Sequence, residues 1–249
     1  MHEIRQEKMN HLIQEREFVS IKELQSLFPD VSLMTIHRDL DALVLAGLIT
    51  KIRGGARSVR HERDLAFDVR AGENLRGKAQ VAERAAALIA QESCIFLDSG
   101  TTCLALARLL PDSPMTVITT GPNIALSLAH VAGPSVTMCP GNLNKENLTV
   151  SGYSTLQFLE TINIDLAFIG VSGYGKKEGF TCGKESEMMV KRQIIKQARK
   201  TVVLCDQTKF WRLMPFTFAK LEDVDIVVSD DTPPEGFRQA AEEAGVLLL

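Results

Sequence analysis

The sequence has few features of a secreted, membrane-bound or metal-binding protein. Its five cysteines are odd in number and widely spaced, without a CxxC pair, so neither a disulfide framework nor a cysteine-based metal site is predicted. No stretch approaches the roughly 18 consecutive apolar residues of a membrane span, and no signal-peptide pattern opens the chain. We therefore expect a cytoplasmic protein with reduced thiols, no membrane association, no metal and no cofactor.

The sequence also lacks the net positive charge that a nucleic-acid partner would favour, because its formal net charge is −3 at pH 7. The charge is nevertheless unevenly spread. Residues 51–63 contain five basic residues and one acidic residue, Glu62. This local cluster would suit contact with DNA phosphates, but a solvated run of charges explains it equally well.

No internal repeat or low-complexity tract is present, and 249 residues exceed one typical domain. Two stretches with different patterns are separated by residues 58–75, which are highly charged and have no apolar periodicity. We predict a small first domain over residues 1–57, a charged linker over residues 58–75 and a larger second domain over residues 76–249.

Residues 31–56 have the pattern of an amphipathic helix followed by a hairpin. Ser32 is placed to cap the helix, and Gly47 can end it in the left-handed conformation. Residues 48–53 then alternate apolar and polar, before the tight turn that Gly54 and Gly55 favour. One apolar stripe at helical spacing carries the helix prediction, and it consists of Ile36, Leu40, Leu43 and Val44.

Two further helices are predicted before this one. Ser20 and Glu23 have the spacing of a capping box, and Pro29 ends the second helix. The residues expected to face inward are Ile4, Met9, Leu12 and Ile13 on the first helix, and Ile21, Leu24, Leu27 and Phe28 on the second. This order of helices and wing is that of a winged helix-turn-helix, although an ordinary surface helix with a hairpin would show the same local pattern.

In that arrangement the third helix enters the major groove of DNA. Arg38 points almost directly away from the apolar stripe, with Thr35 beside it. The residues that we predict to bind DNA lie at the start and on the outer face of this helix and on the wing, and they are Ser32, Thr35, His37, Arg38, Lys51, Arg53 and Arg57.

From residue 76 onwards, helical stretches alternate with short apolar runs. The predicted helices cover residues 78–91, 102–110, 122–132, 185–199 and 234–244, and the predicted strands cover residues 94–97, 115–118, 135–139, 166–169, 201–204, 226–228 and 246–249. Buried strands separated by helices indicate an α/β domain with a doubly wound, mostly parallel sheet. Ligands bind such sheets at the carboxyl ends of the strands.

The polar residues that follow these strands are therefore the candidate ligand site. A small, hydroxyl-rich turn after the first strand, residues 98–102, can present amides and hydroxyls to an anion, or it is only a turn with a good cap. It lacks the Gly-Lys-Thr ending of a nucleotide-binding loop, which favours a sugar phosphate over ATP. Lys209 follows a later strand and either binds this anion or pairs with Asp206. The candidate effector-binding residues are Asp98, Ser99, Gly100, Thr101, Thr102, Asp165, Gly170, Gly173, Asp206 and Lys209.

These motifs together carry a family resemblance. Residues 18–24, 31–40 and 47–56 resemble the N-terminal signature of DeoR-family transcriptional regulators. The Asp-Ser-Gly-Thr-Thr turn, the strand from Asp165 to Gly173 and the Leu-x-Asp-x-Thr-Lys-Phe strand end at Phe210 resemble the family's sensor domain, which is similar in fold to ribose-5-phosphate isomerase.

The resemblance implies a regulator with two kinds of partner. It would bind double-stranded operator DNA as a homodimer or higher oligomer, as a repressor of a carbohydrate-utilisation operon. A phosphorylated sugar or sugar alcohol would release or modulate it, with Ser99 to Thr102 holding the phosphate and Lys209 assisting.

The sequence departs from the family pattern at four places. His37 and Arg53 stand where the family usually has an arginine and a histidine, which leaves the base preference open but keeps a cation in the wing. Residues 119–121 and 140–141 differ from the Thr-Asn and Gly-Gly that commonly follow the second and third strands. Glu185 and Glu187, at a helix start, could reach sugar hydroxyls, but acids there usually only complement the helix dipole.

A sugar-phosphate isomerase with an accessory DNA-binding domain is the alternative. Isomerisation needs a carboxylate as base beside the carbonyl carbon and stabilisation of the enediolate. The strand that begins at Asp165 continues Leu-Ala-Phe and provides no second carboxylate. The sequence therefore favours a sensor over an enzyme.

Overall fold

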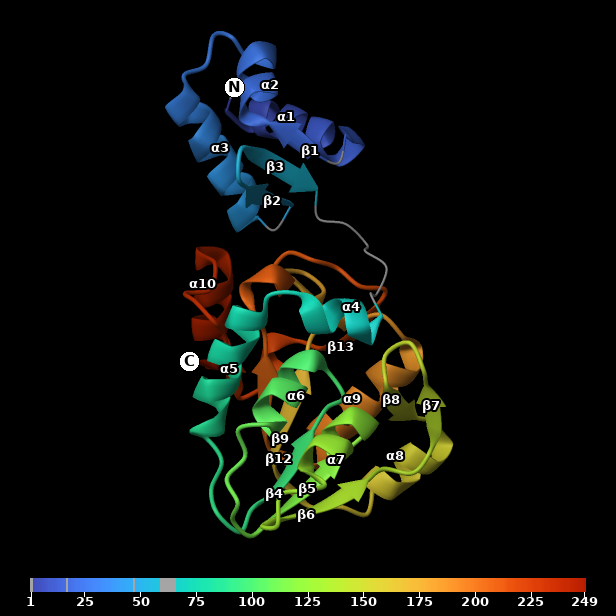
Figure 1. Ribbon diagram of the computed structural model, residues 1–249. Helices are drawn as coiled ribbons and strands as arrows, with labels where there is room; N and C mark the ends of the chain where they lie inside the picture. Colours follow the sequence, from blue (N-terminus) through green and yellow to red (C-terminus); the bar gives the residue numbers. More distant parts are fainter. Residues whose placement is uncertain (1, 17, 47, 59–65) are drawn as a thin grey trace.

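The computed structural model describes residues 2–16, 18–46, 48–58 and 66–249. It consists of a small N-terminal domain and a larger α/β domain (Figure 1). The elements of the first domain are α1 (His2–Arg16), β1 (Phe18–Ser20), α2 (Ile21–Leu27), α3 (Leu33–Leu45), β2 (Ile49–Ile52) and β3 (Gly55–Ser58). Its three strands form an antiparallel sheet in the order β1-β3-β2. This confirms the winged helix-turn-helix, with β2 and β3 as the wing.

The predicted caps of this domain are present. Ser20 and Glu23 form both hydrogen bonds of a capping box at the start of α2, and Ser32 accepts a hydrogen bond from the Thr35 amide at 3.2 Å. The predicted stripe on α3 is buried at Ile36, Leu40 and Leu43. These local interactions fix where the second and third helices begin.

Two apolar residues expected to face inward are exposed instead. Ile4 is 58% exposed and Leu27 is 49% exposed. On a helix with about 100° per residue, Ile4 lies roughly 140° away from the buried Met9, so the two cannot share a face. Leu27 is the last residue of α2, where the chain turns away from the core.

An ion pair that the sequence pattern did not reveal ties the first helix to the third. Asp39 on α3 is fully buried and accepts hydrogen bonds from Arg5 and Gln6 on α1. The acid next to Arg38 is therefore part of the core, whereas Arg38 itself is exposed.

The second domain is built on a seven-stranded parallel sheet in the order β15-β14-β12-β9-β4-β5-β6. Its strands are β4 (Cys94–Leu97), β5 (Met115–Thr119), β6 (Pro134–Met138), β9 (Ile164–Gly170), β12 (Ala198–Leu204), β14 (Ile226–Val228) and β15 (Leu247–Leu248). Its helices are α4 (Phe67–Gly72), α5 (Leu75–Ala86), α6 (Thr101–Ala107), α7 (Pro122–Leu128), α8 (Tyr153–Leu159), α9 (Glu185–Gln197) and α10 (Glu235–Glu243). The doubly wound α/β fold is thus confirmed.

Several short elements lie outside this sheet and were not predicted. They are the hairpin β7 (Asn142–Asn144) and β8 (Thr149–Ser151), the small sheet of β10 (Gly173–Gly175), β11 (Gly179–Cys182) and β13 (Phe216–Ala219), and the 3-10 turns η1 (Gln207–Lys209) and η2 (Leu221–Asp223). The turn η1 directly follows β12 and brings Lys209 back towards the sheet edge.

Alternate side chains of each strand enter two separate cores. On β4, Phe96 contributes to one core while Ile95 and Leu97 contribute to the other. Helices α8, α9 and α10 cover the first face, and α5, α6 and α7 cover the second. Because both faces are buried, the strands are almost entirely apolar, which is why the sequence predicted them well.

The strand order places a topological switch point between β4 and β9. From β4 the chain runs outward through β5 to β6, and it then returns to the other side of β4 through β9, β12, β14 and β15. The loops that follow β4 and β9 therefore diverge and leave a crevice at the carboxyl edge of the sheet. This edge faces the N-terminal domain (Figure 1).

The predicted linker is only partly a linker. Residues 66–75 carry α4 and the start of α5, with Phe67 buried and its amide donating to the Glu146 carbonyl at 2.7 Å. The Lys78 ammonium donates to the carbonyls of Arg70 and Glu73. A six-residue helix with one buried side chain produces no detectable periodicity, so this segment was missed. Residues 59–65 of the predicted linker lie outside the described residues.

All five cysteines are free thiols, as expected. Four are buried and Cys94 is partly buried. Burial raises the pKa of Cys139 and of Cys182 to about 12, and it also raises the pKa of the Cys205 thiol well above its usual value. These thiols are protonated at neutral pH.

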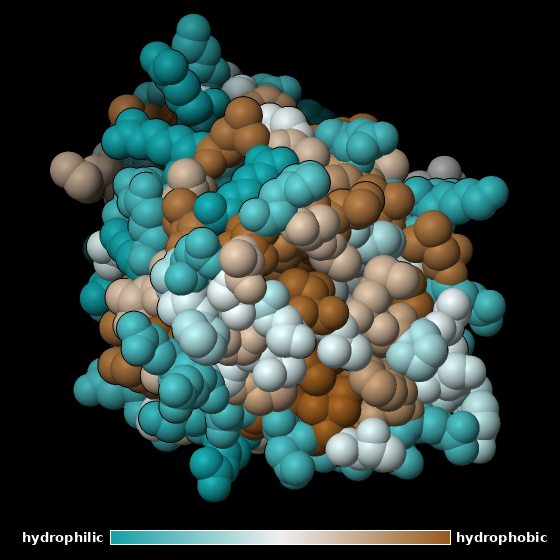
Figure 2. All heavy atoms as spheres, turned by 60° about the horizontal axis from the view of Figure 1, so that its bottom comes forward, coloured by the Kyte–Doolittle hydropathy of each residue, from teal (hydrophilic) through white to brown (hydrophobic). Residues whose placement is uncertain are grey.

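The surface of the molecule is mixed in polarity. Figure 2 shows apolar side chains near the middle of the face turned away from the N-terminal domain, bordered by hydrophilic ones. Within the described ranges, no helix combines the length and the apolar character needed to cross a membrane.

Candidate ligand site and DNA-binding face

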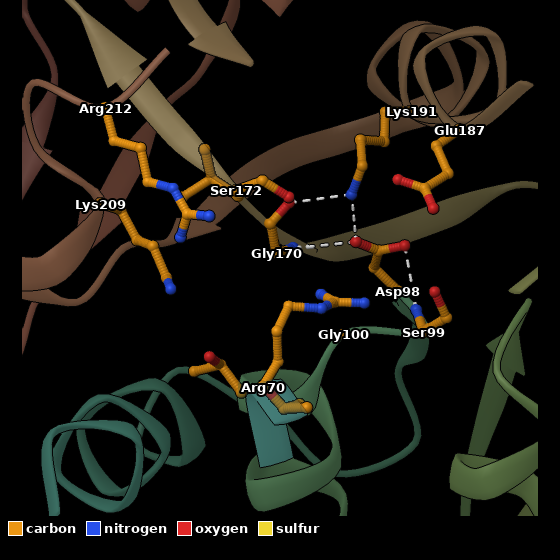
Figure 3. Close-up of a pocket in the computed structure, with 13 residues that line it drawn as sticks. Arg70, Asp98, Ser99, Gly100, Gly170, Ser172, Glu187, Lys191, Lys209 and Arg212 are labelled. Atoms are coloured by element: carbon orange, nitrogen blue, oxygen red, sulfur yellow. Dashed lines mark hydrogen bonds and ion pairs between the residues drawn. The ribbon is translucent and has the colours of Figure 1, made fainter. Parts of the chain in front are cut away.

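A pocket lies at the switch point between β4 and β9 (Figure 3). Four parts of the chain line it: the loop after β4, the loop after β9, helix α9 and the segment that follows β12, with α4 closing it from below in the view of Figure 3. The lining residues are Arg70, Asp98, Ser99, Gly100, Thr101, Thr102, Gly170, Val171, Ser172, Glu187, Lys191, Lys209 and Arg212.

Asp98 is the centre of the hydrogen-bond network. One carboxylate oxygen accepts from the Lys191 ammonium and from the Gly170 amide at 3.1 Å, and the other accepts from the Ser99 amide at 2.9 Å. Burial alone would lower the pKa of Lys191, but the nearby anions, Asp98 first, raise it above its usual value. Asp98 therefore fixes the two loops and is neutralised by a charged lysine.

The loop after β4 is also held from its other side. The Ser99 hydroxyl bonds to the Thr149 hydroxyl on β8. Gly100 lies against Gly170, because a side chain carbon added at Gly100 would stand 3.9 Å from the Gly170 Cα atom. Helix α6 begins at Thr101, and both Thr101 and Thr102 line the pocket.

The pocket has an excess of positive charge. Four cations line it, namely Arg70, Lys191, Lys209 and Arg212, against the two carboxylates Asp98 and Glu187. The excess of two charges matches a phosphate monoester, which carries about −1.5 to −2 at neutral pH.

Most of the predicted effector residues meet at this pocket. The turn of residues 98–102, Gly170 and Lys209 line it together. Lys209 also lies 3.9 Å from the Asp206 carboxylate, so the ion pair is present, and anion binding by this lysine stays a prediction. Asp206 stands behind the wall and accepts hydrogen bonds from Thr208 and Asn74.

Besides Asp206, two more predicted residues do not line the pocket. Gly173 packs against the Arg212 carbonyl, which is 2.2 Å from where a Cβ atom would lie, so it positions Arg212. Asp165 was placed wrongly: it lies near the start of β9, where its carboxylate accepts from the Cys94 amide at 2.9 Å. Gly170 ends the same strand about 16 Å further along, at roughly 3.3 Å per residue.

Three of the four cations were missed from the sequence. Lys191 is four residues after Glu187 on α9, a spacing that shares one helix face, and this was the available signal. Arg212 lies on the irregular segment after Lys209, and Arg70 lies on α4, which the charged-linker prediction obscured. Glu187, predicted either to reach sugar hydroxyls or only to complement the helix dipole, lines the pocket and accepts a hydrogen bond from the Asn147 side chain at 2.5 Å.

The predicted DNA-binding face is largely open to solvent. Arg38 on α3 and Arg53 and Arg57 on the wing are exposed, while Thr35 and His37 are half-buried. Lys51 is engaged within the domain, because its ammonium pairs with Asp41 at 2.5 Å. It thus ties the wing to α3 as well as carrying charge.

Family models match both domains. A DeoR-like helix-turn-helix domain matches residues 5–62, and a DeoR C terminal sensor domain matches residues 73–231. The chain belongs to the DeoR family. It is a DNA-binding transcriptional regulator with a C-terminal sensor domain.

Curated relatives of this DeoR-family chain are transcriptional regulators, and the match covers most of their length. The transcriptional regulator GolR of Listeria innocua is 32% identical over 97% of this chain and 96% of its own. GlpR of Haloferax volcanii is 32% identical over 86% and 85%, and the repressor GlcR of Bacillus subtilis is 32% identical over 88% and 85%. The chain is therefore a regulator, and the isomerase alternative is not favoured.

Solved structures give a weaker likeness. A ribose 5-phosphate isomerase from Methanocaldococcus jannaschii is 18% identical and covers 53% of each chain, with a TM-score of 0.39. The eIF2B beta subunit of Chaetomium thermophilum covers 68% of this chain and 53% of its own, at 13% identity and a TM-score of 0.44. Among the residues that the structure describes, no cluster of side chains suits a metal ion.

Proposed function

We propose that this DeoR-family regulator represses a carbohydrate-utilisation operon and is released by a phosphorylated sugar or sugar alcohol bound at the switch-point pocket. The observation that carries the proposal is the excess of two positive charges at the crevice between β4 and β9. Sheets of this kind bind their ligands at such a crevice, and a phosphate monoester has the complementary charge.

The lining residues divide into two groups by what they can offer. Lys209, Arg212 and Arg70 supply charge-assisted donors to the phosphate, whereas Lys191 is held by Asp98 and the Gly170 carbonyl and contributes mainly its charge. The Thr101 and Thr102 hydroxyls at the start of α6 are suited to the phosphate as well, and the Glu187 carboxylate is suited to the sugar hydroxyls. The unphosphorylated sugar should therefore bind far more weakly.

The proposed regulator acts on DNA in the cytoplasm as at least a homodimer. Helix-turn-helix dimers bind two half-sites, so operator symmetry mirrors the two-fold symmetry of the protein. The exposed Arg38 and Arg53 are then presented twice on one face of the duplex.

A thermal-shift screen with matched pairs of phosphorylated and unphosphorylated sugars tests the proposal. A phosphorylated hit should raise the Tm of the wild type and release it from its upstream DNA in a gel-shift assay. Thr101→Asp places a negative charge at the phosphate position and should bind DNA without responding to the hit, whereas the surface variant Thr161→Asp should respond normally. Equal Tm increases for wild type and Thr101→Asp would place the site elsewhere.

A further inference from the structure

The C-terminal end of the recognition helix α3 docks on the sensor domain. The last carbonyls of a helix have no partner within the helix, and here the Leu45 carbonyl accepts from the Lys176 ammonium at 3.3 Å. Helix α10 packs against the same residue, since a Cβ atom added at Gly236 would lie 3.0 Å from the Leu45 carbonyl oxygen. Val44 packs against the cores of both domains.

The wing faces the sensor domain at a second place. Residues 50–52, 57 and 58 of the wing and the segment 207–212 of the sensor line one cavity of about 340 Å³. Trp211, the only tryptophan of the chain, lies in this wall at 3% exposure. Its φ of 62° is in the left-handed region, and its indole N–H has no hydrogen-bond partner within the described part of the chain.

The segment 207–212 belongs to the ligand pocket as well. Lys209 and Arg212 line the switch-point pocket, and Arg212 also lines the cavity beside the wing. The segment therefore separates the proposed phosphate site from the DNA-binding domain by a single layer of residues. A non-glycine backbone in the left-handed region is strained and persists only where surrounding contacts hold it.

Arg212 belongs both to the pocket and to the cavity beside the wing. A phosphate that draws the Arg212 guanidinium and the Lys209 ammonium into the pocket therefore pulls the segment 207–212 away from the wing. We propose, on the basis of the proposed function above, that binding of a phosphorylated ligand and docking of the DNA-binding domain oppose each other through the segment 207–212.

This opposition has a defined consequence for the DNA-binding domain. Docking holds α3 and the wing in one orientation relative to the sensor. A ligand that displaces the segment 207–212 removes the wing's support and frees the domain to rotate. Coupling between two equilibria is reciprocal. If the ligand favours undocking by some factor, a change that undocks the domain must increase the affinity for the ligand by that factor.

Trp211 fluorescence of the full-length protein measures this coupling, with inorganic phosphate as the probe at constant ionic strength. Two variants undock α3 without touching the pocket: Lys176→Ala removes the donor to Leu45, and Gly236→Glu places a side chain against it. Lys177→Ala removes the same charge from the neighbouring exposed residue and is the matched control.

We expect half-saturation at a phosphate concentration about fivefold or more lower in both undocked variants, and unchanged in Lys177→Ala. Thr101→Asp should abolish the response. Half-saturation equal to or higher than that of the wild type in the undocked variants would overturn the coupling while leaving the pocket intact. A lack of response in every protein would overturn both the coupling and the proposed site.

Discussion

At the scale of single residues, the buried pair of Asp98 and Lys191 organises the sensor domain. The pair joins the loop after β4 to α9 and, through the Gly170 amide, to β9. The sequence predicted the importance of Asp98 from its turn motif, but as a ligand contact. Its partner lies 93 residues away, and no local pattern links two residues at that separation, so the pairing required the structure.

Lys191→Met should destabilise the sensor domain by about 3–5 kcal/mol, because it leaves the Asp98 carboxylate buried without its counter-charge. Denaturant unfolding measures the free energy of unfolding of this variant. The double variant Asp98→Asn/Lys191→Met should be less destabilised than the sum of the two single changes. Strict additivity would show that the two charges do not depend on each other.

Lys78 should make the free energy of unfolding depend on pH in the alkaline range. Burial, followed by the charge of Lys209, lowers its pKa from 10.5 to about 8. Between these two values the unfolded chain binds more protons than the folded one, so the contribution of Lys78 to the free energy of unfolding rises with pH. Below pH 8 both states hold the proton and the contribution is constant.

Comparison of wild type and Lys78→Met by urea unfolding from pH 7.5 to 10.5 checks this sign. The difference in the free energy of unfolding, wild type minus variant, should increase over that range. Parallel curves for the two proteins would mean that the Lys78 ammonium is better solvated than its buried position indicates.

At the scale of elements, the success of prediction from the sequence depended on the length and the apolar periodicity of each segment. Helix α3 and the buried strands β4, β5, β9 and β12 have clear apolar patterns and were predicted. The three-residue strands β7, β8 and β10 and the short helix α4 have no pattern that periodicity can detect. Arg70 lies on α4 and was missed for this reason.

The recognition helix and the wing should contribute differently to DNA binding. Arg38→Ala should cost about 1–3 kcal/mol on specific sites, as expected for an arginine bidentate to guanine. Arg53→Ala should weaken specific and random DNA alike and reduce the salt dependence, as expected for a phosphate contact. Fluorescence anisotropy on both DNAs at several salt concentrations measures these effects. Equal losses on specific and random DNA for Arg38→Ala would contradict base recognition.

At the scale of the whole molecule, the two domains were predicted but their docking was not. The docking contacts join Leu45 to Lys176 and Gly236, residues with no shared motif that become neighbours only in the folded chain. The carboxyl edge of the sheet faces the DNA-binding domain (Figure 1), so the ligand pocket and the docking surface lie on one side of the sensor.

Undocking should therefore imitate the effector. Gly236→Glu and Lys176→Ala should each weaken operator binding in the absence of ligand, by about fivefold or more if the coupling is of typical size. Gel shifts of the two variants beside Lys177→Ala test this. Unchanged operator affinity in both undocked variants would show that docking does not orient the DNA-binding domain.

The burial of the native thiols has a practical consequence for following such domain movements. Reaction with alkylating reagents requires the thiolate, and the raised pKa of Cys139, Cys182 and Cys205 keeps these side chains protonated as well as inaccessible. A cysteine introduced at an exposed position should then react with a maleimide dye much faster than any of the four buried thiols. Dye pairs on the wing and on the sensor can thus report the separation of the domains in the otherwise native chain, with only the partly buried Cys94 requiring replacement.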